Sequence, residues 1–430
     1  MGTGEFTIGG VPASELAARY GTPLFAYDAA VVDRQWRLLR TALPAEFAIY
    51  YSVKANPAQR FLHTLLEKGA GLEIASAGEY CQARAAGCPP EMIIFAGPGK
   101  SEAELDLVLS HGVGEIHIES LVEAERIAAI AARRNVRVPA ALRVNPAAEA
   151  EGGAMRMGGR PAPFGIDEET VDEALDRILS WNTLDFRGIH IFAGTQILSA
   201  GILLAQYRKG VEIARRVAER LGRPLRTLDF GGGLGIPYFS HERELDIEAV
   251  GAGVASLMEE LRPDPLFRGT RFCIEPGRYL AGESGVYIAR VTDIKVSRGK
   301  KFLIVDGGMH HHLAASGNLG QTIKRNYPVR ILNRLETPAG DLVDVVGPLC
   351  TPLDVLARAI QLPAAEIGDL VGVFQSGAYA RSASPLGFLS HPAPPEVWVE
   401  AGSHTLIRRR GDYADYTRDQ CAELAQEAAR

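Results

Sequence analysis

The sequence predicts an α/β protein in which a (β/α)8 TIM barrel precedes a C-terminal antiparallel β domain. Eight short strand-like runs alternate with segments of helical spacing over about 230 residues, which is the size and rhythm of a TIM barrel. Three successive glycines follow the seventh run, whereas a doubly wound sheet, the alternative, places its glycine loop after the first strand. After residue 279 the strand-like runs continue without helices between them, which predicts a second, β-rich domain.

The barrel elements are recognised by apolar periodicity and by glycine or proline at their ends. We therefore assign residues 26–280 to the barrel. Strands are expected at residues 47–53, 71–76, 92–97, 115–120, 140–145, 186–194, 228–233 and 272–277. Helices are expected at residues 61–66, 122–133, 171–179, 203–221 and 247–261.

The β domain is assigned to residues 281–430 together with residues 1–25. Residues 6–10 are predicted to form one of its strands, and residues 413–430 are predicted to form a polar helix or a frayed end. Its other strands are expected at residues 286–291, 302–305, 341–346, 369–374 and 397–400.

Composition limits the class of protein. With 430 residues, 47% of them hydrophobic, the chain is long enough for a large core and more than one domain. The net charge of −6 includes no polybasic segment, so neither nucleic acid nor a membrane surface is expected as a partner. No apolar run of transmembrane length and no signal-peptide pattern is found, so we expect a cytoplasmic protein. Five cysteines without a Cys-x-x-Cys pair predict reduced thiols.

Lys54 ends a β-prone, aromatic run, and an Asn-Pro pair at residues 56–57 then turns the chain. This places Lys54 at the carboxyl end of the first barrel strand, where barrel active sites gather. A lysine that closes a strand is usually a solvated surface residue. In a largely desolvated pocket, however, a lysine loses its proton and forms a Schiff base with a carbonyl.

Two further segments fall at the carboxyl ends of strands next to that of Lys54 in a closed barrel. Gly231, Gly232 and Gly233 follow the seventh strand and let backbone N–H groups approach a phosphate, although a flexible turn is the alternative. Glu275 follows the eighth strand, and a glutamate opposite the lysine could hold a proton on a ring nitrogen. A phosphate site, a Schiff-base lysine and a ring-nitrogen acid together describe pyridoxal phosphate.

Five segments resemble the fold-type III pyridoxal-phosphate decarboxylases, the group of diaminopimelate, ornithine and arginine decarboxylases. The segments are residues 51–56 (Tyr-Ser-Val-Lys-Ala-Asn), 229–233 (Asp-Phe-Gly-Gly-Gly), 275–279 (Glu-Pro-Gly-Arg-Tyr), 347–350 (Gly-Pro-Leu-Cys) and 377–379 (Gly-Ala-Tyr), in the family's order. The resemblance covers about residues 6 to 388. It implies a barrel with an alanine racemase-like β domain, in a homodimer whose active sites are shared across the interface.

The resemblance implies a role for each matching residue. Lys54 would carry the cofactor, Glu275 would pair with its pyridine nitrogen, and Cys350 would return a proton to Cα after CO2 leaves. Without the resemblance, Cys350 would be taken for a buried, inert cysteine. The cofactor contacts implied are Lys54, Glu73, Arg143, Phe192, Thr195, Gly231, Gly232, Gly233, Glu275, Gly277, Arg278 and Tyr379. The substrate contacts implied are Arg278, Thr351 and Asp354.

Departures from the family pattern concern the substrate. Phe192 stands where the family usually has the histidine that stacks on the cofactor, and a phenyl face can also stack. Diaminopimelate decarboxylases usually carry Glu-Ser-Gly-Asp after the cysteine, whereas residues 351–354 are Thr-Pro-Leu-Asp. The acid that would meet a distal amino group is lost, unless Asp354 substitutes for it. These departures resemble a subgroup with butirosin-type decarboxylases, which act on glutamate tethered to an acyl carrier protein, and exosortase-associated decarboxylases.

Residues His310, His311 and His312 raise the question of a metal site. On an extended chain neighbouring side chains point to opposite faces, so at most two of the three could converge, and no metal is expected.

We therefore predict a pyridoxal-phosphate-dependent carboxy-lyase that acts on a biosynthetic amino acid, free or tethered to an acyl carrier protein. The alternatives are a meso-diaminopimelate decarboxylase of lysine biosynthesis, a fold-type III racemase and a non-catalytic pyridoxal-binding protein. Cys350 and the large β domain speak against the racemase. Intact Lys54, Glu275 and Cys350 speak against the non-catalytic protein.

Overall fold

The computed structural model describes residues 4–147, 155–156, 161–192, 194–319, 321 and 323–420. The described chain divides into two compact units. The barrel unit comprises Asp33–Pro237 and His241–Gly282, and the β unit comprises the chain up to Val32, Tyr238–Ser240 and the chain from Glu283 onward. None of the helices among the described residues is long and apolar enough to cross a membrane.

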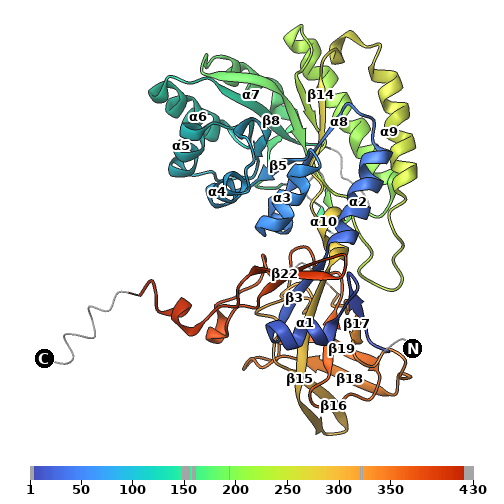
Figure 1. The fold of residues 1–430 in the computed structure, drawn as a ribbon. Helices are drawn as coiled ribbons and strands as arrows, with labels where there is room; N and C mark the ends of the chain where they lie inside the picture. Colours follow the sequence, from blue (N-terminus) through green and yellow to red (C-terminus); the bar gives the residue numbers. More distant parts are fainter. Residues whose placement is uncertain are drawn as a thin grey trace, which may run out of the picture. The chain divides into compact units, whose positions relative to one another are not determined.

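Within the described residues of the barrel unit, eight parallel strands pair in a closed ring, which confirms the predicted TIM barrel (Figure 1). Barrel strands that follow one another in the chain pair with each other, including β7 with β8, and the pairing of β14 with β4 joins the last strand to the first. The strands are β4 (Phe47–Ser52), β5 (Gly71–Ile74), β6 (Ile93–Phe95), β7 (Glu115–Ile118), β8 (Val138–Asn145), β11 (Leu184–Ile191), β13 (Thr227–Asp229) and β14 (Arg271–Ile274).

Helices follow the barrel strands because their apolar faces cover the outside of the ring. Side chains of Ser76, Ser101, Ser120 and Asp246 accept backbone N–H groups and so begin four of them. The helices are α2 (Ala29–Ala42), α3 (Gln59–Glu67), α4 (Ala77–Ala85), α5 (Glu102–His111), α6 (Leu121–Arg134), α7 (Val171–Leu179), α8 (Ala200–Leu221), α9 (Ile247–Leu261) and α10 (Arg278–Ala281). Three short strands of the described residues lie outside the ring: β10 (Ile166–Asp167) beside β8, and β12 (Gly194–Thr195) paired with β9 (Met155–Arg156).

The β unit is built on a nine-stranded mixed sheet of the described residues. The expectation of an antiparallel domain is wrong for two pairs, because β16 runs parallel to β18 and β21 runs parallel to β3. The strands are β3 (Leu24–Asp28), β15 (Gly285–Ser297), β16 (Lys300–Val305), β17 (Val329–Ile331), β18 (Asp341–Val346), β19 (Val355–Leu362), β20 (Leu370–Val373), β21 (Glu396–Glu400) and β22 (Ser403–Arg408). The long β15 pairs with β3, β16 and β20 along its length.

In the N-terminal segment, the strand that joins the large sheet is not the predicted one. Among the described strands, β1 (Thr7–Ile8) pairs only with β2 (Val11–Pro12), whereas β3 enters the large sheet between β15 and β21. Helix α1 (Ala13–Tyr20) lies between them in the chain and packs Leu16 into a core with Ile8 and Val397. At the other end, Tyr413–Tyr416 form a short 3-10 turn, and the rest of the predicted tail from residue 421, with Cys421, lies outside the described residues. The four described cysteines carry free thiols.

Candidate active site

Lys54 lies at the carboxyl end of β4, as predicted. The strand ends at Ser52, and a single 3-10 turn, Val53–Ala55, holds the lysine directly after it. Its Nζ pairs with the Glu73 Oε2 at 2.6 Å, and Glu73 is almost fully buried on the neighbouring strand β5. The Lys54 side chain is 43% exposed, so the expected desolvated pocket is not seen around this lysine. Its ammonium is instead held by a buried carboxylate.

The loop after β14 packs directly against the turn that carries Lys54. The Ser52 N–H donates to the Pro276 carbonyl at 3.2 Å, and the Ser52 hydroxyl donates to the Glu275 carbonyl at 3.1 Å. A Cβ on Gly277 would lie 3.0 Å from the Cβ atoms of both Ser52 and Ala55. A side chain at this position would push the two loops apart, so glycine favours their close approach. The first and eighth barrel strands thus bring Lys54 and Glu275 to one end of the barrel.

The glycine loop after β13 lies against the same residues. Gly231 and Gly233 have φ values of +67° and +109°, which side chains rarely adopt. A Cβ on Gly232 would lie 2.6 Å from the Glu275 carbonyl oxygen, and one on Gly231 would lie 3.0 Å from the Phe192 ring. The loop is therefore closely packed against Glu275 and Phe192, and its role in binding a phosphate stays a prediction.

Arg143 and Phe192 form the next part of this end of the barrel. The Arg143 guanidinium lies 5.9 Å from the Phe192 ring centre and donates to Glu119 at 2.7 Å. Thr195 stands in the short strand β12, next to Gly194, whose carbonyl would lie 3.0 Å from a Cβ on Gly233. Arg278 begins the short helix α10 directly after Gly277.

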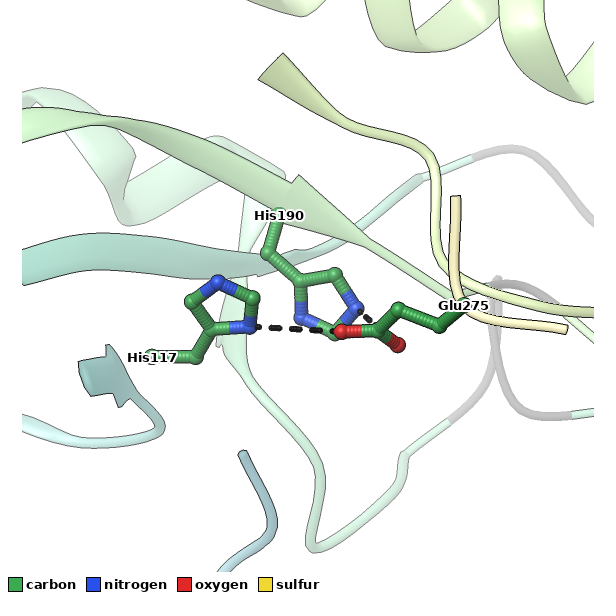
Figure 2. Close-up of side chains that lie close together, drawn as sticks. All are labelled: His117, His190 and Glu275. Carbon is green, nitrogen blue, oxygen red and sulfur yellow. Dashed lines mark ion pairs between the residues drawn. The ribbon is translucent and has the colours of Figure 1, made fainter. Parts of the chain in front are cut away.

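Glu275 also faces two buried histidines, His117 on β7 and His190 on β11 (Figure 2). Its carboxylate lies 3.8 Å from His117 Nδ1 and 3.4 Å from His190 Nε2. The two imidazole rings stack with their centres 4.3 Å apart. Burial, followed by the charges of His117 and Arg143, lowers the pKa of His190 well below its usual value.

In the β unit, Cys350 is exposed, so the reading of this residue as a buried, inert cysteine is wrong. Its loop is shaped by Asp354, whose two carboxylate oxygens accept the N–H groups of Met309 at 2.6 Å and of Leu349 at 2.9 Å. Asp354 is 3% exposed, and burial raises its pKa above the usual value. Its substrate role stays a prediction, but both oxygens are already occupied by the backbone. Thr351 is half-buried, and its hydroxyl accepts the Leu353 N–H at 3.3 Å.

Tyr379 lies in the loop after β20 with a φ of +53°. A bulky residue in the left-handed region is a strained conformation that often marks functional sites.

The three consecutive histidines are not extended, as the prediction assumed, but lie in a turn. The N–H groups of His311 and His312 both donate to the Gly308 carbonyl, and all three side chains are buried. His312 Nε2 lies 2.9 Å from the Ser376 hydroxyl, and His311 Nδ1 lies 3.1 Å from that of Tyr287. These contacts describe a packed element of the β unit.

Comparison with known proteins identifies the family. Residues 29–282 match the family described as "Pyridoxal-dependent decarboxylase, pyridoxal binding domain". The chain belongs to the pyridoxal-dependent decarboxylases. It is 40% identical to the L-glutamyl-[BtrI acyl-carrier protein] decarboxylase of Niallia circulans, over 94% of this chain and 95% of that protein. It is 32% identical to a diaminopimelate decarboxylase of Aquifex aeolicus, over 96% and 94% of the two chains.

Solved structures agree on the fold of this decarboxylase. The diaminopimelate decarboxylase of M. jannaschii in complex with L-lysine superposes with a TM-score of 0.90 at 23% identity, over 98% of this chain and 97% of that one. The predicted barrel and additional β domain are therefore shown by the described strands and by this neighbour.

The residues of the decarboxylase barrel fit the cofactor of its family. Glu275 is 5% exposed, and among the described residues its Oε1 has no hydrogen-bond partner. A buried carboxylate oxygen of this kind suits a protonated ring nitrogen. The closely packed glycine loop leaves no space for side chains at the position predicted for a phosphate.

Sequence reasoning missed His117, Glu115 and Asp229 as members of the site. A signal was present in Glu115-Ile116-His117-Ile118-Glu119, where polar and apolar residues alternate and place the polar ones on one face of the strand. In an open sheet that face would meet solvent, whereas barrel closure turns it inward.

Proposed function

We propose that the chain binds pyridoxal phosphate and removes the α-carboxylate of an amino acid tethered to an acyl carrier protein. The observation that carries the substrate choice is the loop beside Cys350. Asp354 is the only acid in residues 347–354, all of which are described, and both of its oxygens accept backbone N–H groups. Asp354 is also 3% exposed, so this loop presents no accessible carboxylate to a distal ammonium group, as meso-diaminopimelate would require. The 40% identity to a glutamyl-carrier decarboxylase supports the same choice.

The barrel residues would hold the cofactor. Lys54 would be its covalent attachment point, exchanging its ion pair with Glu73 for that bond. Glu275 would face the ring nitrogen and Phe192 would stack on the ring. The phosphate would be bound by the glycine loop with Thr195, Arg278 and Tyr379, while Glu73, Arg143 and Gly277 line the pocket. When bound, pyridoxal phosphate takes up the electron pair released as the carboxylate leaves.

Cys350 would return a proton to Cα, which its exposed position in the β unit allows. We further propose a homodimer in which the barrel of one subunit and the Cys350 loop of its partner form one site, and a location in the cytoplasm, where thiols stay reduced. To test sharing, inactive Lys54→Ala chains are mixed with inactive Cys350→Ala chains. Partial recovery of activity is expected, because a mixed dimer regains one complete site. No recovery despite verified subunit exchange would contradict shared sites.

The substrate is tested by measuring CO2 release from glutamate, glutamyl-acyl carrier protein, ornithine, arginine and meso-diaminopimelate. We expect the carrier-bound substrate to have the highest kcat/KM. A value of about 10⁴ M⁻¹s⁻¹ or above for meso-diaminopimelate, exceeding all others, would overturn this choice. It would favour diaminopimelate decarboxylation, the activity named for several relatives at 30–33% identity. Inverted amino acid without CO2 would instead identify a racemase.

A further inference from the structure

His117 lies inside the barrel, where carboxylates from three strands face it. Its Nε2 lies 3.3 Å from Glu115 Oε1 and 4.0 Å from Asp229 Oδ2, and its Nδ1 lies 3.8 Å from Glu275 Oε1. None of the four side chains is more than 5% exposed. Figure 2 shows the His117 ring directed at the Glu275 carboxylate, with the His190 ring beside it.

A buried carboxylate that stays charged without a cation costs several kcal/mol, so charges inside the barrel have to be balanced. Besides His117, Glu115 has its own cation in Arg271, whose guanidinium lies 3.4 Å from Glu115 Oε2, and Thr227 donates to the same oxygen at 2.8 Å. Burial alone would raise the pKa of Glu115, but its contacts with His117, Arg271 and Thr227 hold it below the usual value. Glu115 therefore remains ionised and paired.

Asp229 and Glu275 are the other two acids. Burial and the neighbouring Glu275 carboxylate raise the pKa of Asp229 well above its usual value, which favours its protonated form. Glu275 can then remain an anion only if a cation faces it. His190 is not that cation, because burial and the charges of His117 and Arg143 lower its pKa well below the usual range.

Two other cations at this end of the barrel are already paired. Lys54 holds Glu73 at 2.6 Å, and Arg143 holds Glu119 at 2.7 Å. Among the described residues, the imidazole of His117 faces all three carboxylates of the cluster and is placed to supply a positive charge to them.

A metal ion bound by His117, His190 and Glu275 is a competing explanation, because their ligand atoms lie within 4.8 Å of one another. Imidazole binds metals along the nitrogen lone pair, which lies in the ring plane, at about 2.0–2.1 Å. The two rings are stacked at 4.3 Å with only 23° between their planes. Lone pairs in nearly parallel planes this far apart do not converge on one ion, so the geometry favours proton sharing.

We infer that His117 is a positioning residue that carries the proton balancing Glu275, and that it thereby keeps the Glu275 carboxylate ionised. The inference rests on the proposed function in one respect, that Glu275 faces the ring nitrogen of the cofactor. An ionised Glu275 retains a proton on that nitrogen. Without His117, Glu275 takes up a proton itself, as Asp229 does, and its hold on the nitrogen weakens.

The test is His117→Asn, with His190→Asn as the matched control because His190 lies at 3.4 Å from Glu275, closer than His117 at 3.8 Å, and burial lowers its pKa. Infrared spectra of cofactor-free protein should show a new protonated-carboxyl band in His117→Asn that disappears in the double variant with Glu275→Gln. His190→Asn should show no such band. In loaded enzyme, His117→Asn should retain its cofactor and lose at least tenfold in kcat at neutral pH. The loss should shrink as pH rises, because Glu275 then ionises.

Absence of the new band, or a pH profile of His117→Asn parallel to that of the wild type, would overturn the inference. If His117→Asn does not fold, the wild-type spectrum minus that of Glu275→Gln serves in its place. That difference spectrum should contain no protonated-carboxyl band, because Glu275 of the wild type is ionised. A band there would show that Glu275 is already neutral and would overturn the inference. Protein that binds no pyridoxal phosphate yet gives the expected infrared result would refute the proposed function and leave the charge assignment of His117 intact.

Discussion

The two units bury histidines in opposite surroundings. In the barrel unit, His117 meets three carboxylates within 4.0 Å. In the β unit, His311 and His312 meet the hydroxyls of Tyr287 and Ser376. Burial is similar in both places, so the neighbours decide what an imidazole does. The proposed charge of His117 rests on the acids that surround it, whereas burial among hydroxyl groups lowers the pKa of His311 and His312 and leaves both rings uncharged.

The largest expected effect on the comparison of the two units is the loss of cofactor attachment in the barrel unit. Lys54→Ala in the barrel unit should abolish covalent cofactor attachment and lower kcat by at least about 10⁴-fold, a small part of the acceleration that enzymes achieve. Absorbance of the bound cofactor and mass spectrometry after borohydride reduction measure attachment. Lys68→Ala is the matched control, since Lys68 is also ion-paired at 2.6 Å, to Asp33 of the same unit, and should keep the label. Labelled, active Lys54→Ala protein would refute the assignment of Lys54.

A substitution in the β unit should separate turnover from cofactor binding. Cys350→Ala should keep the cofactor absorbance and lower kcat by about 10²–10⁴-fold, the usual contribution of a positioned proton donor. Cys81→Ala removes another exposed thiol, in the barrel unit, and should leave kcat as it is. If Cys350→Ala released the cofactor, or if its kcat equalled that of the wild type, the proton-return role would be wrong.

The two units also differ in how far the sequence predicted them. Helices α7 and α9 have the predicted bounds because the apolar period of a helix is local. Strand β3 was missed because its partner β15 lies about 260 residues away in the chain, and parallel pairs such as β3 with β21 leave no local pattern. Barrel topology makes neighbours in sequence neighbours in space, whereas the β unit assembles distant segments.

Within the site, motif residues were predictable and their supporting shell was not. Lys54 and Glu275 stand at strand ends, which sequence patterns mark. His117 and Asp229 lie within strands, and only ring closure turns them toward each other. The histidine turn at residues 310–312 depends on Gly308, where a Cβ would lie 2.1 Å from Asp354 Oδ1, a contact that no local pattern reveals.

The Cys350 loop offers a stability test of the β unit. Asp354→Asn exchanges one oxygen acceptor for an amide donor, so one of the N–H groups of Met309 and Leu349 loses its partner. The cost of an unsatisfied buried donor predicts a loss of about 1–3 kcal/mol in the free energy of unfolding, measured by urea denaturation. Asp293→Asn is the control, since Asp293 also accepts a backbone N–H, at 2.8 Å, but is exposed, and should change stability by less than about 0.5 kcal/mol. Unchanged relative kcat/KM values among substrates would show that Asp354 acts only through the loop.

The smallest effect concerns the neutral histidines of the β unit. Burial lowers the pKa of His312 to about 3 from 6.5. As pH falls below 6.5, the unfolded chain takes up a proton that the folded chain refuses, so stability is lost until about pH 3. His312→Gln keeps a polar group near Ser376 but removes this titration. The free energy of unfolding should then fall less steeply between pH 6 and 4, by up to about 1.4 kcal/mol per pH unit. Urea denaturation at each pH measures the slope, and a constant offset measured at pH 8 isolates packing changes. Equal slopes for variant and wild type would show that the folded chain protonates His312 as readily as the unfolded chain does. The contrast between the two units would then not hold.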